Sequence, residues 1–435
     1  MITHKIFQFL YLISQNKKVI FGSLGLIFLF CLRQGVILTP DSATYISLSS
    51  VRIGLYPLTI LLFQSIFKEH ALQALVVFQL GFAITASYHM ATFLRSTFNL
   101  PAFMHWVFIA TFLSPLIVFK SANEIMSEGL AYPLFLVSSY FLLKGVLYRD
   151  IKCLLAFSFS IFLLSFTRQQ YLFFYVVGVV ALLYLSFFGN GFNKKIQFFL
   201  AIICSCSLFF VSEKTYHYIF HSSFSGTPFT GVQLLIRPLY VSAMDSYKTF
   251  EEPKQREFVK EVMQEIFNQN LMDQDPHKRE LTGFTLHYNT ICHKISSPIL
   301  GKIWQPQVNE STMNYLQTIN QQTIDISLKL MKINAVHYIK SYTKDVIHGF
   351  GGYILWGFVL FTSLLCFIII ASNRYFSVFY PFFILTTLIH LGNLLIICFF
   401  EPPLFRYTYS TGLLLASMLF IMSYQYVNKL SHSSV

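Results

Sequence analysis

Runs of apolar residues, each long enough to cross a lipid bilayer as a helix, recur along most of the sequence. A membrane-spanning helix needs about 20 such residues, and inside lipid only helices and closed barrels satisfy their own backbone hydrogen bonds. About ten segments meet this length: residues 18–38, 71–94, 101–119, 128–147, 151–167, 171–188, 196–212, 347–371, 376–399 and 405–426. The sequence therefore predicts an all-α polytopic membrane protein with about ten transmembrane helices.

Composition supports this prediction. Charged residues make up 11% of the chain, whereas an ordinary soluble domain carries roughly 25%. The net charge of +12 would suit a nucleic-acid ligand in a soluble protein, but in a membrane protein an excess of Lys and Arg marks the cytoplasmic loops. We therefore expect membrane lipid, and no nucleic acid, as a partner.

The distribution of basic residues predicts the orientation of the chain. With ten spans and a cytoplasmic N-terminus, eleven basic residues fall on the cytoplasmic side: Lys5, Lys17, Lys18, Arg95, Lys144, Arg149, Lys152, Lys194, Lys195, Arg374 and Lys429. Five fall in the short outer loops: Arg52, Lys68, Lys120, Arg168 and Arg406. This bias predicts that both termini are cytoplasmic. A bacterial inner membrane is the expected location.

The spans divide the chain into three parts. Residues 1–212 form an N-terminal module of seven spans, and residues 346–435 form a C-terminal module of three. Between them lies a polar, mostly helical extracytoplasmic domain, 213–345, in which Glu251–Met272 and Thr323–Val346 have the periodicity of amphipathic helices. In the first outer loop, 39–70, the apolar stretch Ile53–Phe67 contains Pro57 and is short for a span, so we expect it to lie in the membrane interface.

The few acidic residues outside the polar domain gather on the predicted outer side. Asp41, Glu69, Glu124, Glu128 and Glu401 lie there, and Asp150 is the exception. An ionisable residue within a span is costly, and such residues are usually functional or paired. The outer face is therefore the predicted active or binding face.

Two segments supply the carboxylates. In TPDSATYISLSS, Asp41 precedes Tyr45 by one helical turn; its carboxylate is either an N-cap or a general base for an acceptor hydroxyl or amine. In SANEIMSE, Glu124 and Glu128 are four residues apart and are expected to share one helix face. They are either solvated acids near a helix N-terminus or ligands of a divalent cation or of substrate hydroxyls.

Two further segments supply arginines. In FTRQQY, Arg168 and Gln169 lie between two apolar spans, where the guanidinium either extends to the interface or contacts a phosphate. In EPPLFRY, Arg406 and Tyr407 open the last span. Arg406 either pairs with Glu401 or binds an anionic headgroup.

Taken in order, these segments resemble the GT-C superfamily of membrane glycosyltransferases, which includes the protein O-mannosyltransferases and the aminoarabinose transferase of lipid A. DSATY and RIGLYPL, with Arg52 and Tyr56, resemble the first outer loop of that family. SANEIMSEGLAYPLFLVSSYFLL, SFTRQQY and FRYTYSTGLLLASML resemble its third loop with the fourth span, its Thr-Arg stretch and its final span. Many members carry two adjacent acids in the first loop, whereas this chain has Asp41 followed by Ser42, and Gln169 stands where Pro is usual.

The resemblance implies an inverting glycosyltransferase that moves a sugar from a polyprenyl-phosphate-linked donor to a lipid, glycan or protein acceptor at the outer face. Asp41 would be the general base. Arg168 and Arg406 would stabilise the departing phosphate, and Glu124 or Glu128 would hold sugar hydroxyls or a divalent cation. Tyr45, Arg52, Tyr56, Gln169, Glu401 and Tyr407 would complete the substrate site.

Two other functions remain open from the sequence. One is an O-antigen polymerase or ligase, for which the polar domain offers Arg237, Arg256, Arg279 and His287. The other is a transporter or flippase of lipid-linked glycans. A transporter predicts polar residues near the membrane midplane and repeated halves with broken helices, and neither is evident here.

Overall fold

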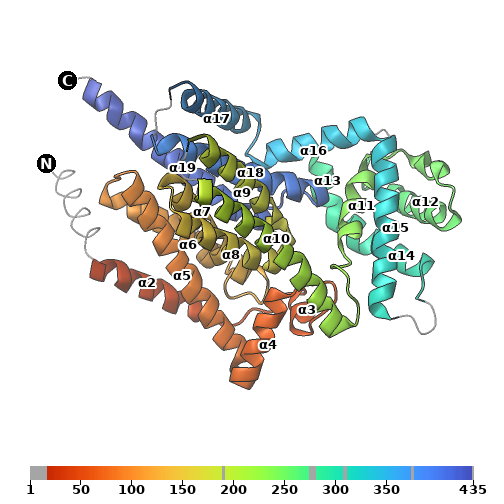
Figure 1. The fold of residues 1–435 in the computed structure, drawn as a ribbon. Helices are drawn as coiled ribbons and strands as arrows, with labels where there is room; N and C mark the ends of the chain where they lie inside the picture. Colours follow the sequence, from red (N-terminus) through yellow and green to blue (C-terminus); the bar gives the residue numbers. More distant parts are fainter. Residues whose placement is uncertain (1–16, 189–191, 274–280, 307–310, 374–376, 434–435) are drawn as a thin grey trace. The chain divides into compact units, whose positions relative to one another are not determined.

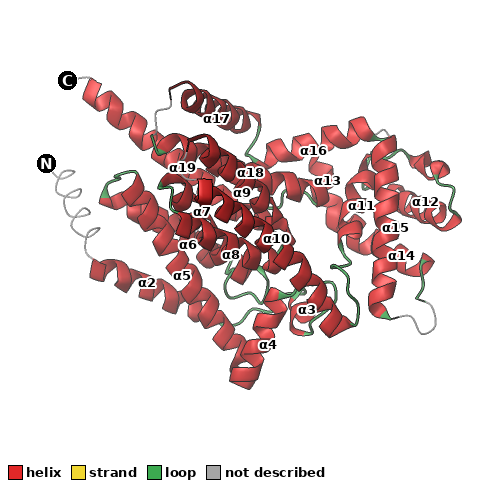
Figure 2. Ribbon diagram, viewed as in Figure 1, coloured by secondary structure: helices red, strands yellow, loops and turns green. Residues whose placement is uncertain are grey.

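The computed structural model describes residues 17–188, 192–273, 281–306, 311–373 and 377–433. Within these ranges the regular elements are all helices, joined by loops (Figure 2). The described part of the chain contains no strand, only an isolated β-bridge between Ile37 and Glu124. The predicted all-helical fold class is confirmed.

The helices follow one another along the chain as labelled in Figure 1. Up to the long helix α10 they are α2 (Lys17–Leu32), α3 (Ser42–Ile46), α4 (Leu55–Phe67), η1 (Lys68–His70), α5 (Ala71–Thr97), α6 (Ala102–Val118), α7 (Glu128–Leu147), α8 (Ile151–Thr167), η2 (Gln169–Leu172), α9 (Phe173–Phe188) and α10 (Phe192–His221). The remainder are α11 (Thr230–Val241), η3 (Met244–Thr249), α12 (Pro253–Asn268), α13 (Leu281–Asn289), η4 (Thr290–Ser296), α14 (Ser297–Ile303), α15 (Thr312–Ile333), α16 (Ala335–Gly349), α17 (Tyr353–Asn373), α18 (Phe379–Phe400) and α19 (Phe405–Ser433).

Six helical segments among the described residues are long and apolar enough to cross a membrane: Leu55–Thr97, Glu128–Leu147, Gln169–Phe187, Asn193–His221, Tyr353–Ser372 and Phe379–Phe400. Three shorter apolar helices are Lys18–Leu32, Ala102–Val118 and Ile151–Thr167. By length and composition these helices could span a membrane, which is consistent with an integral membrane protein, while the count of about ten spans stays a prediction.

The first of these segments folds back on itself. Tyr56 Oη accepts a hydrogen bond of 3.0 Å from Gln79 Nε2, 23 residues further along the chain, and the Phe63 and Phe78 rings are 5.6 Å apart. In one uninterrupted helix, 23 residues would separate the pair by roughly 34 Å. The chain therefore reverses between α4 and α5, and α4, with 13 residues, is the separate short helix that the sequence predicts.

Three helix boundaries differ from the sequence prediction. The helix expected to reach Leu38 ends at Leu32, and Asn123 Nδ2 donates to the nearby carbonyls of Cys31 and Gly35. The helix expected over Thr323–Val346 is instead α15 and α16, separated at Asn334. The span expected from residue 347 starts later, at Tyr353, because Gly351 and Gly352 have positive φ angles of 92° and 101° and break the helix.

The chain divides into two compact units. The first comprises the described residues of Met1–Glu213, Leu360–His390 and Tyr409–Val435. Helix α7 is its central element: it packs against both α5 and α8, and Gly129–Leu136 are all buried. A helix that is apolar on every face is typical of a protein interior or of a membrane span, and in α7 protein covers most of these faces.

The second unit comprises Lys214–Val359 and Leu391–Thr408, again within the described residues. It has its own hydrophobic core, built largely from α11, α12 and the α13–η4 segment, with α15 packed against them. The predicted amphipathic helix of Glu251–Met272 is confirmed as α12, which buries Phe258, Val259, Val262, Met263 and Ile266 along one face.

Candidate functional site

Asp41 and Arg52, both in the segment between α2 and α4, form an ion pair with 2.7 Å between Arg52 Nη2 and Asp41 Oδ1. Asp41 directly precedes α3, but its side chain makes no capping hydrogen bond. Ser42 Oγ instead accepts from the backbone N–H of Thr39 at 2.8 Å. The capping explanation for the Asp41 carboxylate is therefore wrong. The Asp41 side chain stays 41% exposed, so a substrate can reach it.

Each of the three nitrogens of the Arg52 guanidinium makes a hydrogen bond within this loop. Its Nε donates to Thr44 Oγ1 at 2.8 Å and its Nη1 to Tyr45 Oη at 3.3 Å, while Cζ lies 4.4 Å from the centre of the Tyr45 ring. A planar guanidinium bound at three corners fixes the carboxylate beside it more firmly than a single contact could. Arg52 therefore orients Asp41.

Tyr45 connects this loop to the start of α7. Its hydroxyl lies 3.1 Å from Ser127 Oγ, and its ring packs edge-on against Tyr56 at 5.2 Å. Tyr56 is fully buried and receives the hydrogen bond from Gln79. Tyr56 thus supports the Tyr45 ring.

Glu128 and Arg168 form a second ion pair, with 2.6 Å between Glu128 Oε1 and Arg168 Nη1. The two side chains are only 11% and 18% exposed. Ser127 Oγ donates to Glu128 Oε2 at 3.4 Å, which joins this pair to Tyr45. Continuous polar contacts therefore connect two carboxylate–arginine pairs. We call this group the acid–arginine cluster: Asp41, Tyr45, Arg52, Ser127, Glu128 and Arg168.

Glu124 lies outside α7, which begins at Glu128, so the expectation that both acids share one helix face is wrong. Ile37 pairs here with the segment around Glu124, accepting from Ile125 N–H at 3.0 Å and donating to Asn123 O at 2.9 Å. This backbone pairing replaces the helical turn that the four-residue spacing suggested. Among the described residues, no three His, Cys, Asp or Glu side chains are grouped as metal ligands.

Gln169 binds a carboxylate that no sequence motif indicated. Its Nε2 donates to Glu213 Oε1 at 2.7 Å, and Glu213 is buried. The available signal was a single carboxylate in α10, directly after the apolar stretch of that helix. Ser127 was also missed, although it lies in the SANEIMSE segment.

Glu401, Arg406 and Tyr407 belong to the second unit. The Glu401 carboxylate accepts a hydrogen bond of 2.5 Å from Gln233 Nε2, and the Tyr407 carbonyl accepts from Asn393 Nδ2 at 3.1 Å. Arg406 is exposed, donates to the Tyr407 hydroxyl and stacks over that ring with Cζ 4.5 Å from its centre. Gln233 is a partner that no local sequence pattern indicates.

Arg237 forms the most deeply buried ion pair of the described second unit. Its Nη2 lies 2.5 Å from Asp345 Oδ2, and neither side chain is exposed. Burial raises the pKa of Asp345, and the adjacent Arg237 acts in the opposite direction. Arg237 also lies 4.4 Å from the Phe284 ring. These contacts give Arg237 a structural role.

Arg256, another arginine considered for a ligase site, donates from Nε to the Phe250 carbonyl at 2.7 Å. His287 is partly buried at the end of α13, and Arg279 lies outside the described residues. The described arginines of the polar domain therefore hold the fold together. They do not form a cluster of substrate-binding side chains.

The acid–arginine cluster combines an accessible carboxylate with guanidinium groups. An exposed, oriented carboxylate can accept a proton, and a guanidinium is suited to phosphate oxygens. No protein-family model, no curated protein and no solved structure matches this chain.

Proposed function

We propose that this chain is an integral-membrane glycosyltransferase that moves a sugar from a polyprenyl-phosphate-linked donor to a lipid, glycan or protein acceptor. The observation that carries the proposal is the acid–arginine cluster, in which the accessible Asp41 carboxylate is paired with Arg52 and is connected through Tyr45 and Ser127 to the Glu128–Arg168 pair. It occurs in a unit whose helices are long and apolar enough to cross a membrane. The phosphate of such a donor suits the arginines of the cluster, and its lipid tail suits the apolar helices.

In the proposed reaction, a hydroxyl or amine of the acceptor attacks the anomeric carbon of the donor sugar. The bond between that carbon and the phosphate oxygen breaks, and the bonding electrons leave with the polyprenyl phosphate. Asp41 accepts the acceptor's proton, and the configuration at the anomeric carbon inverts because the attack is direct. The 41% exposure of the Asp41 side chain supports its assignment as base over Glu128, which is largely buried.

The two arginines of the cluster have different parts in this proposal. Arg52 is a positioning residue, because its contacts with Asp41, Thr44 and Tyr45 occupy Nη2, Nε and Nη1. Arg168, with Glu128 fixing its Nη1, would stabilise the negative charge that develops on the departing phosphate.

Orientation and location are part of the same proposal. The excess of basic residues in alternate loops supports cytoplasmic termini and a cluster on the outer side of a bacterial inner membrane. There a polyprenyl-phosphate-linked sugar and an envelope acceptor would meet. The segment 213–345 would help to select the acceptor. A divalent cation held by Glu124 or Glu128 is not needed for the steps described.

The test is Asp41→Asn in proteoliposomes supplied with a panel of short-chain polyprenyl-phosphate sugars. We expect the release of polyprenyl phosphate to fall by roughly 10²–10⁴-fold, because the general base is lost while the shape of the side chain is kept. Asp150→Asn is the matched control. Asp150 caps α8 through Lys152 N–H, a contact that Asn preserves, so that variant should keep wild-type turnover.

Two results would contradict the proposal. Near-normal turnover of Asp41→Asn would exclude Asp41 as the base. Movement of the intact donor across the vesicle membrane without release of polyprenyl phosphate would identify a transporter instead.

A further inference from the structure

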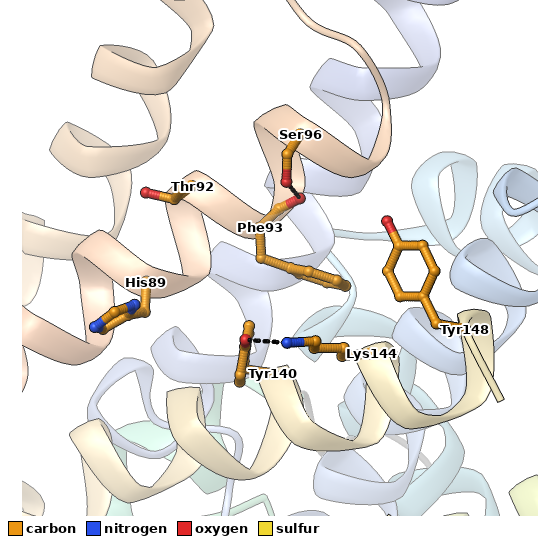
Figure 3. A pocket seen from close by; sticks show the side chains of 7 residues that line it. All are labelled: His89, Thr92, Phe93, Ser96, Tyr140, Lys144 and Tyr148. Carbon is orange, nitrogen blue, oxygen red and sulfur yellow. Dashed lines mark hydrogen bonds between the residues drawn. The ribbon is translucent and has the colours of Figure 1, made fainter. Parts of the chain in front are cut away.

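Helices α5 and α7 form a polar groove near their C-terminal ends, apart from the acid–arginine cluster (Figure 3). The groove encloses a cavity of about 380 Å³. From α5 it is lined by His89, Thr92, Phe93 and Ser96, from α7 by Tyr140 and Lys144, and from the residue after α7 by Tyr148. The spacing of these residues places a polar stripe on each helix, and the two stripes border the same cavity.

The two helices run in the same direction and end on the same side of the first unit. Gln79 on α5 lies against Gly129 at the start of α7, and Phe93 lies against Tyr140, with 5.3 Å between ring centres. Lys144 follows Glu128 by about 16 residues, which corresponds to roughly 24 Å along the helix. The groove is therefore separated from the cluster by most of the thickness of a hydrocarbon core, which is roughly 30 Å.

The chemistry of the groove favours an anion. Lys144 Nζ donates to Tyr140 Oη at 3.0 Å, and Figure 3 shows these two groups facing each other. A lysine ammonium has three N–H donors, and Tyr140, which accepts here, can still donate its own O–H. None of the seven lining residues is acidic. Lys144 thus offers a positive charge among hydroxyl groups.

A ligand of this groove must also be compatible with the apolar helices that surround it. His89, Thr92 and Ser96 line the groove on a helix that is otherwise apolar enough to cross a membrane. Polar groups at the boundary of the hydrocarbon region are stable when water, a headgroup or another polar group meets them. Phe93, Tyr140 and Tyr148 add aromatic side chains, and tyrosine is enriched at this level of a bilayer.

We propose that this groove binds the phosphate of an anionic phospholipid headgroup. Lys144 provides the charge, Tyr140 and His89 provide additional donors, and the acyl chains lie along the apolar surface of the same helices. Phosphate is the shared chemistry of a lipid headgroup and of free inorganic phosphate. The lipid is the favoured source, because both walls of the groove belong to candidate membrane-spanning helices.

The experiment is native mass spectrometry of the full chain released from nanodiscs that contain equal amounts of phosphatidylglycerol and phosphatidylcholine. We expect wild-type protein to retain phosphatidylglycerol preferentially, and Lys144→Gln to reduce that retention by about fivefold, the effect of one basic residue at a membrane surface. Lys152→Gln is the matched control, because Lys152 is exposed and does not line the groove. Lys144→Arg should restore retention.

Competition separates the two sources of phosphate. Inorganic phosphate should leave the lipid adduct unchanged. Displacement of the lipid by inorganic phosphate would overturn the lipid assignment in favour of a free anion. Equal loss of lipid in Lys144→Gln and Lys152→Gln would also overturn it, because it would show only diffuse attraction to surface charge. Circular dichroism and gel filtration of Lys144→Gln, together with the Lys144→Arg variant, exclude misfolding as the cause.

Discussion

At the scale of single residues, the pairing of Asp41 with Arg52 changes the role assigned to the arginine. The sequence alone placed Arg52 among the residues that bind substrate. Its contacts with Thr44, Tyr45 and Asp41 instead make it the group that holds the base. No local pattern could show this, because Arg52 follows Asp41 by 11 residues, and the geometry of the helix and turn between them decides whether the side chains meet.

We expect Arg52→Lys to lower kcat by roughly 10²-fold while KM changes little, because a lysine keeps the charge but cannot orient the carboxylate from three corners. The measurement is the separation of kcat from KM for polyprenyl phosphate release. Arg149→Lys, outside the cluster, is the control. A raised KM at unchanged kcat would instead support the substrate-binding role that the sequence suggested.

The buried pair of Arg237 and Asp345 lies in the second unit, closed to solvent. Arg237→Met leaves the Asp345 charge without its partner in a site that is closed to solvent, and breaking such a pair costs about 3–5 kcal/mol. We expect faster amide hydrogen exchange in α11 and α16 of the full chain. The double variant Arg237→Met/Asp345→Leu should recover most of the loss, because it removes both charges.

The loss of unfolding free energy in Arg237→Met should depend on pH. Burial raises the pKa of Asp345 above its ordinary value of 3.8, so the folded state holds this proton to a higher pH than the unfolded state does. The unfolding free energy therefore falls as the pH rises from about 4 through the raised pKa. Without Arg237 the pKa rises further, so the destabilisation of Arg237→Met should be small in acid and largest at neutral pH. An equal loss at every pH would show that packing against Phe284, and not charge, is what the variant removes.

At the scale of helices, Gly129 determines how closely α7 approaches α5. A Cβ atom at this position would lie 2.4 Å from Gln79 Oε1, and Gln79 is fully buried where it holds Tyr56. We expect Gly129→Ala to cost about 1–3 kcal/mol through overpacking and to lower transfer activity, because Tyr56 supports Tyr45. Thermal unfolding in detergent is the measurement.

Gly81→Ala is the matched control for that experiment. Gly81 lies on α5, and a methyl group added there would have no neighbouring atom within 4 Å. Alanine favours a helix by about 0.5–1 kcal/mol over glycine. This variant should be as stable as wild type or slightly more stable. Equal loss in both variants would show that any methyl group on these helices is harmful, whatever its neighbours.

Helix positions were largely predictable from the sequence, because the length of an apolar run is a local property. The predicted ranges 128–147 and 151–167 coincide with α7 and α8. The break between α15 and α16 was not predictable, because it involves a distant contact: Asn334, between the two helices, donates to Ser242 Oγ at 2.9 Å. The same distinction between local features and distant contacts applies to the candidate site. The segments bearing Asp41, Glu128 and Arg168 were identified, but the contacts made by Arg52, Ser127 and Glu213 emerged only from the packing of helices.

At the scale of the whole molecule, the reversal between α4 and α5 decides how the chain crosses the membrane. Because α4 folds back on α5 and its 13 residues extend only roughly 20 Å, we expect one crossing, not two, between Asp41 and the end of α5. Helix α6 then returns the chain, since Ser87 on α5 donates to the Phe112 carbonyl and Thr92 contacts His105 at the start of α6. Lys68 and Lys120 should therefore lie on the same side of the bilayer.

Cysteine labelling tests this topology directly. We expect Lys68→Cys and Lys120→Cys, in a background without the seven native cysteines, to react with a membrane-impermeant maleimide added from outside. Lys120 precedes the N-terminal end of α7, and Lys152 follows the C-terminal end of that helix. Lys152→Cys should therefore react only after the membrane is opened. Labelling of Lys68→Cys without Lys120→Cys, or the reverse, would place Asp41 and Glu128 at opposite faces. Their connection through Tyr45 and Ser127 could not then exist in the membrane, and both the acid–arginine cluster and the proposed transferase would be excluded together.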